Sequence, residues 1–195
     1  MNPKHLSRLI GTQAQKYGEK TVLYDRDELT DPWTAISWNE MSRLVDTAAK
    51  SLLEMGVKNQ QRVAQFSQNK SENLIVDFAL YSLRAAMIPI YPTSTVQQVE
   101  FIVNDAEIEY MFVGEQNQYD VAAEVIKTSK TLKKLIVFDK AVKFSVPEKS
   151  MYYADFLAIG QKSTKEAEVE KLRDELDEKD IACIMYTSGT TGNPK

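Results

Sequence analysis

Apolar residues near the start of the chain recur at helical spacing in two stretches that are separated by short β-like runs. Gly18 follows the first stretch and is a natural helix stop. The second stretch opens with Ser37 and Glu40, which have the spacing of a capping box, and Gly56 is suited to end it. The pattern predicts a helix over residues 5–17, strands over 21–24 and 35–37, and a helix from Ser37 to about Gly56.

From Arg62 onward, short apolar runs alternate with amphipathic stretches. This alternation is typical of βαβ units and a mostly parallel sheet. Pro89 has no amide hydrogen, so its strand belongs at a sheet edge or at a strand end. Asn69 or Ser71 is suited to cap the first of these helices. The predicted strands cover residues 62–66, 87–90, 110–113 and 134–138, and the predicted helices cover 71–83, 95–105 and 119–128.

The remaining part of the chain is less regular. Residues 139–152 are mixed in composition and predict an excursion before a short helix over 153–159. Residues 163–180 are dense in charge and have the thin apolar stripe of a surface helix. The apolar run 181–186 predicts a buried strand. Together these elements predict an α/β fold, a layered sandwich with a mostly parallel central sheet flanked by helices.

The composition narrows the class of protein. The chain has 195 residues, a formal net charge of −4 and 43% hydrophobic residues, which is ordinary for a globular domain. It lacks the excess of lysine and arginine that is typical of a protein that binds nucleic acid. No apolar run approaches the roughly 18 residues of a membrane span, and the N-terminus shows no signal region. We therefore expect a cytoplasmic protein with no transmembrane segment, for which peripheral membrane contact stays open.

Cysteine and histidine each occur once in the chain, as Cys183 and His5. One cysteine cannot form an internal disulfide, which suits a reducing compartment, and we expect Cys183 to be a buried structural thiol. We expect His5 to be exposed and idle. Catalysis by a Ser-His or Cys-His pair, and a multi-histidine metal site, are not indicated.

The most specific pattern lies in residues 186–195, which read Tyr-Thr-Ser-Gly-Thr-Thr-Gly-Asn-Pro-Lys. Gly189 and Gly192 allow close approach of the backbone to a ligand, the hydroxyl groups are donors, and Lys195 supplies a charge for a phosphate oxygen. A loop of this kind at the carboxyl end of a strand is where α/β proteins place anionic ligands. The lysine-serine/threonine ending of a Walker A motif is missing, so ordinary P-loop chemistry is not indicated.

Residue for residue, this loop resembles the signature loop of the acyl-adenylate-forming superfamily, which includes acyl-CoA synthetases, luciferases and peptide-synthetase adenylation domains. The resemblance extends over residues 36–41, 62–70 and 83–92, with Ala86 at a position where glycine is commoner. The residues most similar to the long-chain fatty acyl-CoA synthetase branch are 90–93, 118–120 and 155–157.

The resemblance implies a reaction and a set of binding residues. A carboxylic acid, here a long-chain fatty acid, attacks ATP to give an acyl-adenylate, and coenzyme A then displaces AMP, with Mg²⁺ as the metal cofactor. We expect no metal ligand within this chain. The residues implied to hold the β- and γ-phosphates of ATP are Thr187, Ser188, Gly189, Thr190, Thr191, Gly192 and Lys195.

The resemblance also implies that residues 1–195 are the N-terminal part of the large AMP-binding domain. The catalytic lysine, the magnesium ligand and the acyl pocket are expected downstream of Lys195, so the chain alone is expected to be inactive and to self-associate. Alternatives are a truncated, non-catalytic remnant or binding module, a member acting on a medium-chain, aromatic or amino acid, and an unrelated nucleotide-binding α/β domain.

Overall fold

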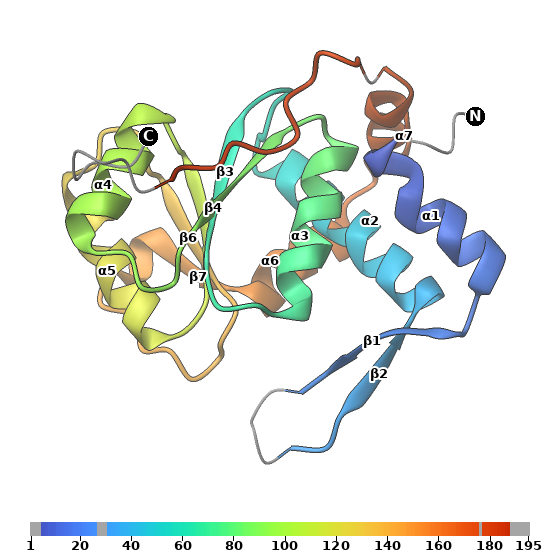
Figure 1. Cartoon of the computed structure of the whole chain (residues 1–195), viewed down its shortest axis with the longest axis horizontal. Helices are drawn as coiled ribbons and strands as arrows, with labels where there is room; N and C mark the ends of the chain where they lie inside the picture. Colours follow the sequence, from blue (N-terminus) through green and yellow to red (C-terminus); the bar gives the residue numbers. More distant parts are fainter. Residues whose placement is uncertain (1–4, 27–30, 176, 188–195) are drawn as a thin grey trace. The chain divides into compact units, whose positions relative to one another are not determined.

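The computed structural model describes residues 5–26, 31–175 and 177–187 (Figure 1). The chain divides into two compact units, each built from segments that are distant in sequence. The first unit comprises Met1–Asn59, Lys70–Arg84 and Leu157–Asp180, and the second comprises Gln60–Asn69, Ala85–Phe156 and Ile181–Lys195. Among the described helices, none has the length and apolar character that a membrane crossing requires.

The first unit is mainly helical and includes a two-stranded antiparallel hairpin. Its elements are α1 (Leu6–Tyr17), β1 (Thr21–Asp25), β2 (Thr34–Ser37), α2 (Trp38–Glu54), α3 (Ser71–Ser82) and α7 (Glu166–Asp174). The boundary between the two units falls inside α6 (Tyr153–Lys162).

The ends of α1 and α2 follow the local signals in the sequence. Gly18 ends α1 at a φ of +56° and donates its amide hydrogen to the carbonyl of Ala14. The Ser37 hydroxyl caps α2 by accepting from the Glu40 amide at 3.2 Å. The Glu40 carboxylate pairs with Arg43, so only half of the expected capping box forms.

A glycine determines how closely α6 approaches α2. The Gly160 amide donates to the Ser51 hydroxyl at 2.9 Å. A β-carbon added at Gly160 would lie 2.0 Å from the carbonyl oxygen of Thr47. Only glycine therefore fits at this crossing.

The second unit contains a five-stranded sheet in the order β4-β3-β5-β6-β7, and every neighbouring pair is parallel. Its strands are β3 (Arg62–Phe66), β4 (Ala86–Ile90), β5 (Tyr110–Val113), β6 (Lys134–Val137) and β7 (Ser150–Tyr152). Helices α4 (Val96–Asp105) and α5 (Gln116–Thr128) pack against one face of the sheet (Figure 1). The α/β class and the parallel sheet expected from the sequence are confirmed.

Pro89 lies in β4, an edge strand of this sheet, as its missing amide hydrogen predicts. Three other expectations need correction. The N-cap of α3 is Lys70 rather than Asn69 or Ser71, and its side chain makes no capping hydrogen bond; the Ser71 hydroxyl instead donates to Asp25. Helix α5 begins at Gln116, since Glu115 and Gln118 form a capping box. The excursion over 139–152 contains a 3-10 turn (Pro147–Lys149) and the strand β7.

Candidate functional site

Of the residues expected to hold phosphate, only Thr187 lies within the described part of the chain, where it is exposed. Ser188, Gly189, Thr190, Thr191, Gly192 and Lys195 lie outside the described residues. Residues 181–187 lead to the loop, and we call them the approach segment.

The approach segment pairs with the outer edge of β4 at a single parallel bridge, between Cys183 and Met87. The Met87 amide donates to the carbonyl of Ala182 at 3.0 Å, and the Ile184 amide donates to the carbonyl of Met87 at 3.0 Å. In a parallel ladder, alternate residues of a strand face the same neighbour. The next backbone amide of β4 that would face the approach segment belongs to residue 89. This residue is a proline, which has no amide hydrogen to donate. The ladder therefore stops after one bridge.

The expectation of a buried strand over 181–186 is accordingly wrong. Ile181 is 49% exposed and Met185 is 71% exposed. Ile184 and Tyr186 pack against the core of the second unit, so one side of the segment is anchored. Cys183 is half-buried rather than fully enclosed. The lone histidine, His5, is also half-buried and precedes α1 as its N-cap residue.

Tyr186 anchors the start of the loop through its side chain. Its hydroxyl donates to the Asp105 carboxylate, at the last residue of α4, with an oxygen–oxygen distance of 2.5 Å. Its ring meets Phe101 edge to face, with 6.4 Å between ring centroids. Because α4 runs back toward the start of β5, Asp105 lies near the amino-terminal edge of the sheet.

The surroundings of Tyr186 favour its neutral form. Burial and the hydrogen bond to Asp105 raise the pKa of Tyr186 to about 12, while Arg62 acts in the opposite direction. A neutral hydroxyl can donate to a carboxylate, whereas a phenolate beside Asp105 would be repelled. The contact is therefore a stable anchor at neutral pH.

The carboxyl edge of the sheet has a tight contact that the sequence analysis did not single out. Gly114 follows β5 and donates its amide hydrogen to the carbonyl of Phe66 at 3.0 Å. A β-carbon at Gly114 would lie 2.8 Å from the Ser67 hydroxyl oxygen. Gly114 thus allows the chain after β5 to pass directly beside the end of β3, at the edge where α/β folds bind ligands.

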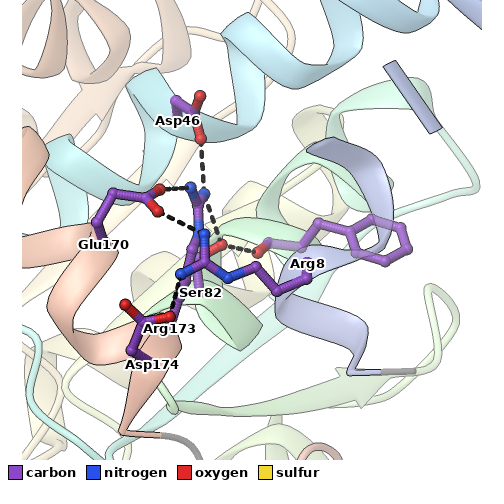
Figure 2. Close-up of polar contacts among 7 residues, drawn as sticks. Arg8, Asp46, Ser82, Glu170, Arg173 and Asp174 are labelled. Carbon is purple, nitrogen blue, oxygen red and sulfur yellow. Dashed lines mark hydrogen bonds and ion pairs between the residues drawn. The ribbon is translucent and has the colours of Figure 1, made fainter. Parts of the chain in front are cut away.

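The first unit contains a cavity of about 590 Å³ whose lining includes Arg8, Arg43 and Arg173. Figure 2 shows how two of these guanidinium groups are neutralised. Arg8 pairs with Glu170 and Asp174, and Arg173 pairs with Glu170 and, at 2.6 Å, with Asp46. At the cavity lining, Arg43 pairs with Glu40. Carboxylates of the chain thus balance these arginines, and the ion pairs fix α7 to α1 and α2.

Within the described residues, no group of three or more histidine, cysteine, aspartate or glutamate side chains is arranged to hold a metal ion. The hydroxyl groups, glycines and lysine of the loop sequence suit anionic phosphate oxygens.

Comparison with known proteins finds relatives that match most of this chain. The chain is 30% identical over 174 residues to the long-chain-fatty-acid–CoA ligase FadD15 of Mycobacterium bovis, and the match covers 89% of this chain and 28% of that ligase. The chain thus spans little more than a quarter of the curated relative.

Solved structures show the same fold. A long-chain-fatty-acid-CoA ligase (FadD1) from Archaeoglobus fulgidus aligns with a TM-score of 0.70 at 22% identity, over 98% of this chain and 35% of that one. The anthranilate CoA ligase AuaEII, in complex with anthranoyl-AMP, aligns with a TM-score of 0.79 at 17% identity, over 98% of this chain and 33% of that one. The family described as AMP-binding enzyme matches residues 10–195, nearly the whole sequence. The chain therefore belongs to the AMP-binding enzyme family.

Proposed function

We propose that this chain supplies the ATP phosphate-binding loop of a ligase that activates a carboxylic acid as its acyl-adenylate and transfers the acyl group to coenzyme A. The observation that supports this most is the order of residues 186–195, which fall within the region matched by the family. In this proposal residues 187–192 surround the β- and γ-phosphates, and Lys195 neutralises them. Each hydrogen bond to a charged phosphate contributes about 1.5–3 kcal/mol.

The reaction needs positioning and charge neutralisation more than covalent help from the protein. A carboxylate oxygen forms a bond to the α-phosphorus of ATP, and pyrophosphate leaves. The thiol of coenzyme A then bonds to the acyl carbon, and AMP leaves. Donors held around the β- and γ-phosphates stabilise the departing pyrophosphate, which is the role we assign to the loop, with Mg²⁺ as the metal that accompanies ATP.

We further propose a long-chain fatty acid as the substrate. The mycobacterial relative is named a long-chain-fatty-acid–CoA ligase, which supports this choice. The likeness to an anthranilate CoA ligase is one of fold alone, yet it shows that this fold also occurs in a ligase of an aromatic acid. We assign residues 1–195 to the N-terminal part of the large domain, with the catalytic lysine, the magnesium ligand and the acyl pocket contributed by sequence that follows this part in the relatives.

The test is the exchange of labelled pyrophosphate into ATP by an enzyme in which this chain is joined to the downstream part of the mycobacterial ligase. The acids offered are fatty acids of graded length and anthranilate. Exchange that depends on a long-chain acid and is lost in the Thr190→Ala/Lys195→Ala double variant is the expected result. Exchange at the parental rate in the double variant would show that the loop does not act on the triphosphate.

A further inference from the structure

Two residues with left-handed backbone conformation, Arg84 and Gln60, bind Asp180 and Ile181 respectively. Arg84 has a φ of +58° and Gln60 has a φ of +57°, and each lies two residues before a strand of the sheet, β4 and β3 respectively. This conformation is uncommon for residues other than glycine and persists where the surroundings stabilise it. The side chains of both residues bind consecutive positions, Asp180 and Ile181.

The contact of Arg84 is an ion pair with two hydrogen bonds. Its Nε lies 2.7 Å from one carboxylate oxygen of Asp180, and its Nη2 lies 3.1 Å from the other. Both side chains are only 14% exposed, so solvent screens the pair less than it screens a surface pair. The pair raises the pKa of Arg84 and lowers the pKa of Asp180, mainly through these hydrogen bonds. Asp180 also accepts from the Asp177 amide, which fixes the orientation of its carboxylate.

The contact of Gln60 holds the next residue along the chain. Its side-chain oxygen accepts from the Ile181 amide at 2.9 Å. Two residues further, the approach segment forms its single bridge to β4, which Pro89 prevents from lengthening. Because the ladder contributes so little, the position of residues 181–187 depends on side-chain contacts at their start and on Tyr186 near their end.

We propose that Arg84 and Gln60 are positioning residues that fix where the approach segment begins and so set the placement of the phosphate-binding loop. The part of this inference that concerns the ligand of the loop rests on the proposed function. The part that concerns the placement of residues 181–187 is independent of the proposed function. Neither residue touches a substrate in this account, and both act through Asp180 and Ile181.

The first experiment follows hydrogen exchange of the Ile184 and Met87 amides, which form the bridge. Arg84→Gly removes the side chain and suits the positive φ, so the backbone is not strained. Asp180→Asn removes the charge at constant shape. Glu107→Gly is the matched control, since Glu107 also has a positive φ, of +52°, and its ion pair is with Arg62 of β3.

Breaking the ion pair should accelerate exchange at both bridge amides about tenfold or more, as expected for loss of hydrogen bonds between charged groups. Arg84→Lys should restore part of the protection, and Glu107→Gly should leave it unchanged. Bridge amides that exchange at the parental rate in Arg84→Gly would overturn the proposal. Equal acceleration at Met111 and Phe112 in the central strand would also overturn it, because the pair would then act on the stability of the whole fold.

A second arm separates this inference from the proposed function. Tripolyphosphate is added, and exchange of the amides in residues 186–195 is followed. Protection in the parent that is weakened in Arg84→Gly supports positioning for phosphate binding. Equal protection in the parent and in Arg84→Gly would overturn the link between Arg84 and the loop. No protection in the parent would count against the proposed function, whereas the outcome of the first arm would still decide the role of Arg84.

Discussion

The Tyr186 hydroxyl donates to the Asp105 carboxylate at 2.5 Å, which ties the first residue of the proposed phosphate-binding loop to the last residue of α4. The bond joins positions 81 residues apart and supplements a backbone ladder that ends after one bridge. The approach segment is thus held by side chains more than by the sheet.

This contact predicts a pH dependence. The pKa of Tyr186 is raised from 10 to about 12 by burial and by Asp105. A group whose folded pKa is raised stabilises the fold fully below its unfolded pKa and loses that contribution as the pH rises through the folded value. The contribution of Tyr186 should therefore be complete below pH 10 and lost by about pH 12.

Alkaline denaturation of the parent and of Tyr186→Phe provides the measurement. The parent should lose stability relative to the variant between these pH values, and near neutral pH Tyr186→Phe should be less stable by about 1 kcal/mol. Parallel pH profiles for the two proteins would show that the hydrogen bond does not exist in solution.

Two helical glycines predict opposite effects of the same substitution. Gly160→Ala places a β-carbon 2.0 Å from the Thr47 carbonyl oxygen and should lower the free energy of unfolding by about 3 kcal/mol. Gly11, in α1, has no atom within 4 Å of an added β-carbon. Gly11→Ala should therefore raise the free energy of unfolding by about 0.5–1 kcal/mol. Urea denaturation compares the two, and equal effects would contradict the close approach of α6 to α2.

The ion pairs of α7 predict sensitivity to acid. Burial raises the pKa of Glu170, but hydrogen bonds from Arg8 and Arg173 outweigh burial and lower it below its ordinary 4.5. A lowered folded pKa gives stability that is present above pH 4.5 and is lost as the pH falls through the folded value. Amides of α7 should accordingly lose exchange protection below pH 4.5.

Arg173→Met tests the cause of this acid sensitivity. The substitution removes the guanidinium group that pairs with both Glu170 and Asp46. The amides of α7 should therefore be less protected from exchange at neutral pH, and their protection should change less on acidification. Lys127→Met, which breaks an exposed pair with Glu124 on α5, is the control and should leave α7 unchanged. An acid response of the parental size in Arg173→Met would assign the effect to other carboxylates.

Pro89 predicts a gain of structure on substitution. Pro89→Val restores an amide hydrogen on the side of β4 that faces the approach segment, and valine favours strands. The new amide should be protected from exchange, and protection at Ile184 should increase. An unprotected amide at residue 89 would mean that something other than the missing hydrogen ends the ladder.

Signals that depend on neighbouring residues predicted much of the fold. Gly18 ended α1, Ser37 capped α2, and Pro89 marked an edge strand, because each acts through its own backbone or its own turn. The three-residue strand β7 could not be predicted in this way, since it exists through pairing with β6. The apolar run 181–186 suggested a buried strand, yet a strand requires a neighbour that can continue the ladder, and β4 has Pro89 at the position of the next donor.

For the candidate site, the sequence predicted which residue types would bind phosphate but not how the chain reaches them. The pairs of Arg84 with Asp180 and of Tyr186 with Asp105 join positions far apart in sequence, so no local sequence pattern predicts them. The close contact of Gly114 with Ser67 is equally invisible, because it depends on how β3 and β5 end side by side.

The most direct test of the central claim is an amide spectrum of this chain titrated with Mg·ATP. If residues 187–192 and Lys195 hold the triphosphate, amide signals of residues 186–195 should shift in a saturable way, with weak affinity because this part has no assigned adenine pocket. The Thr190→Ala/Lys195→Ala variant should lose these shifts, and Lys133→Ala, which removes a surface lysine outside the loop, should keep them. Signals that stay in place at saturating Mg·ATP, or that move equally in the double variant, would contradict the assignment of this loop to the phosphates of ATP.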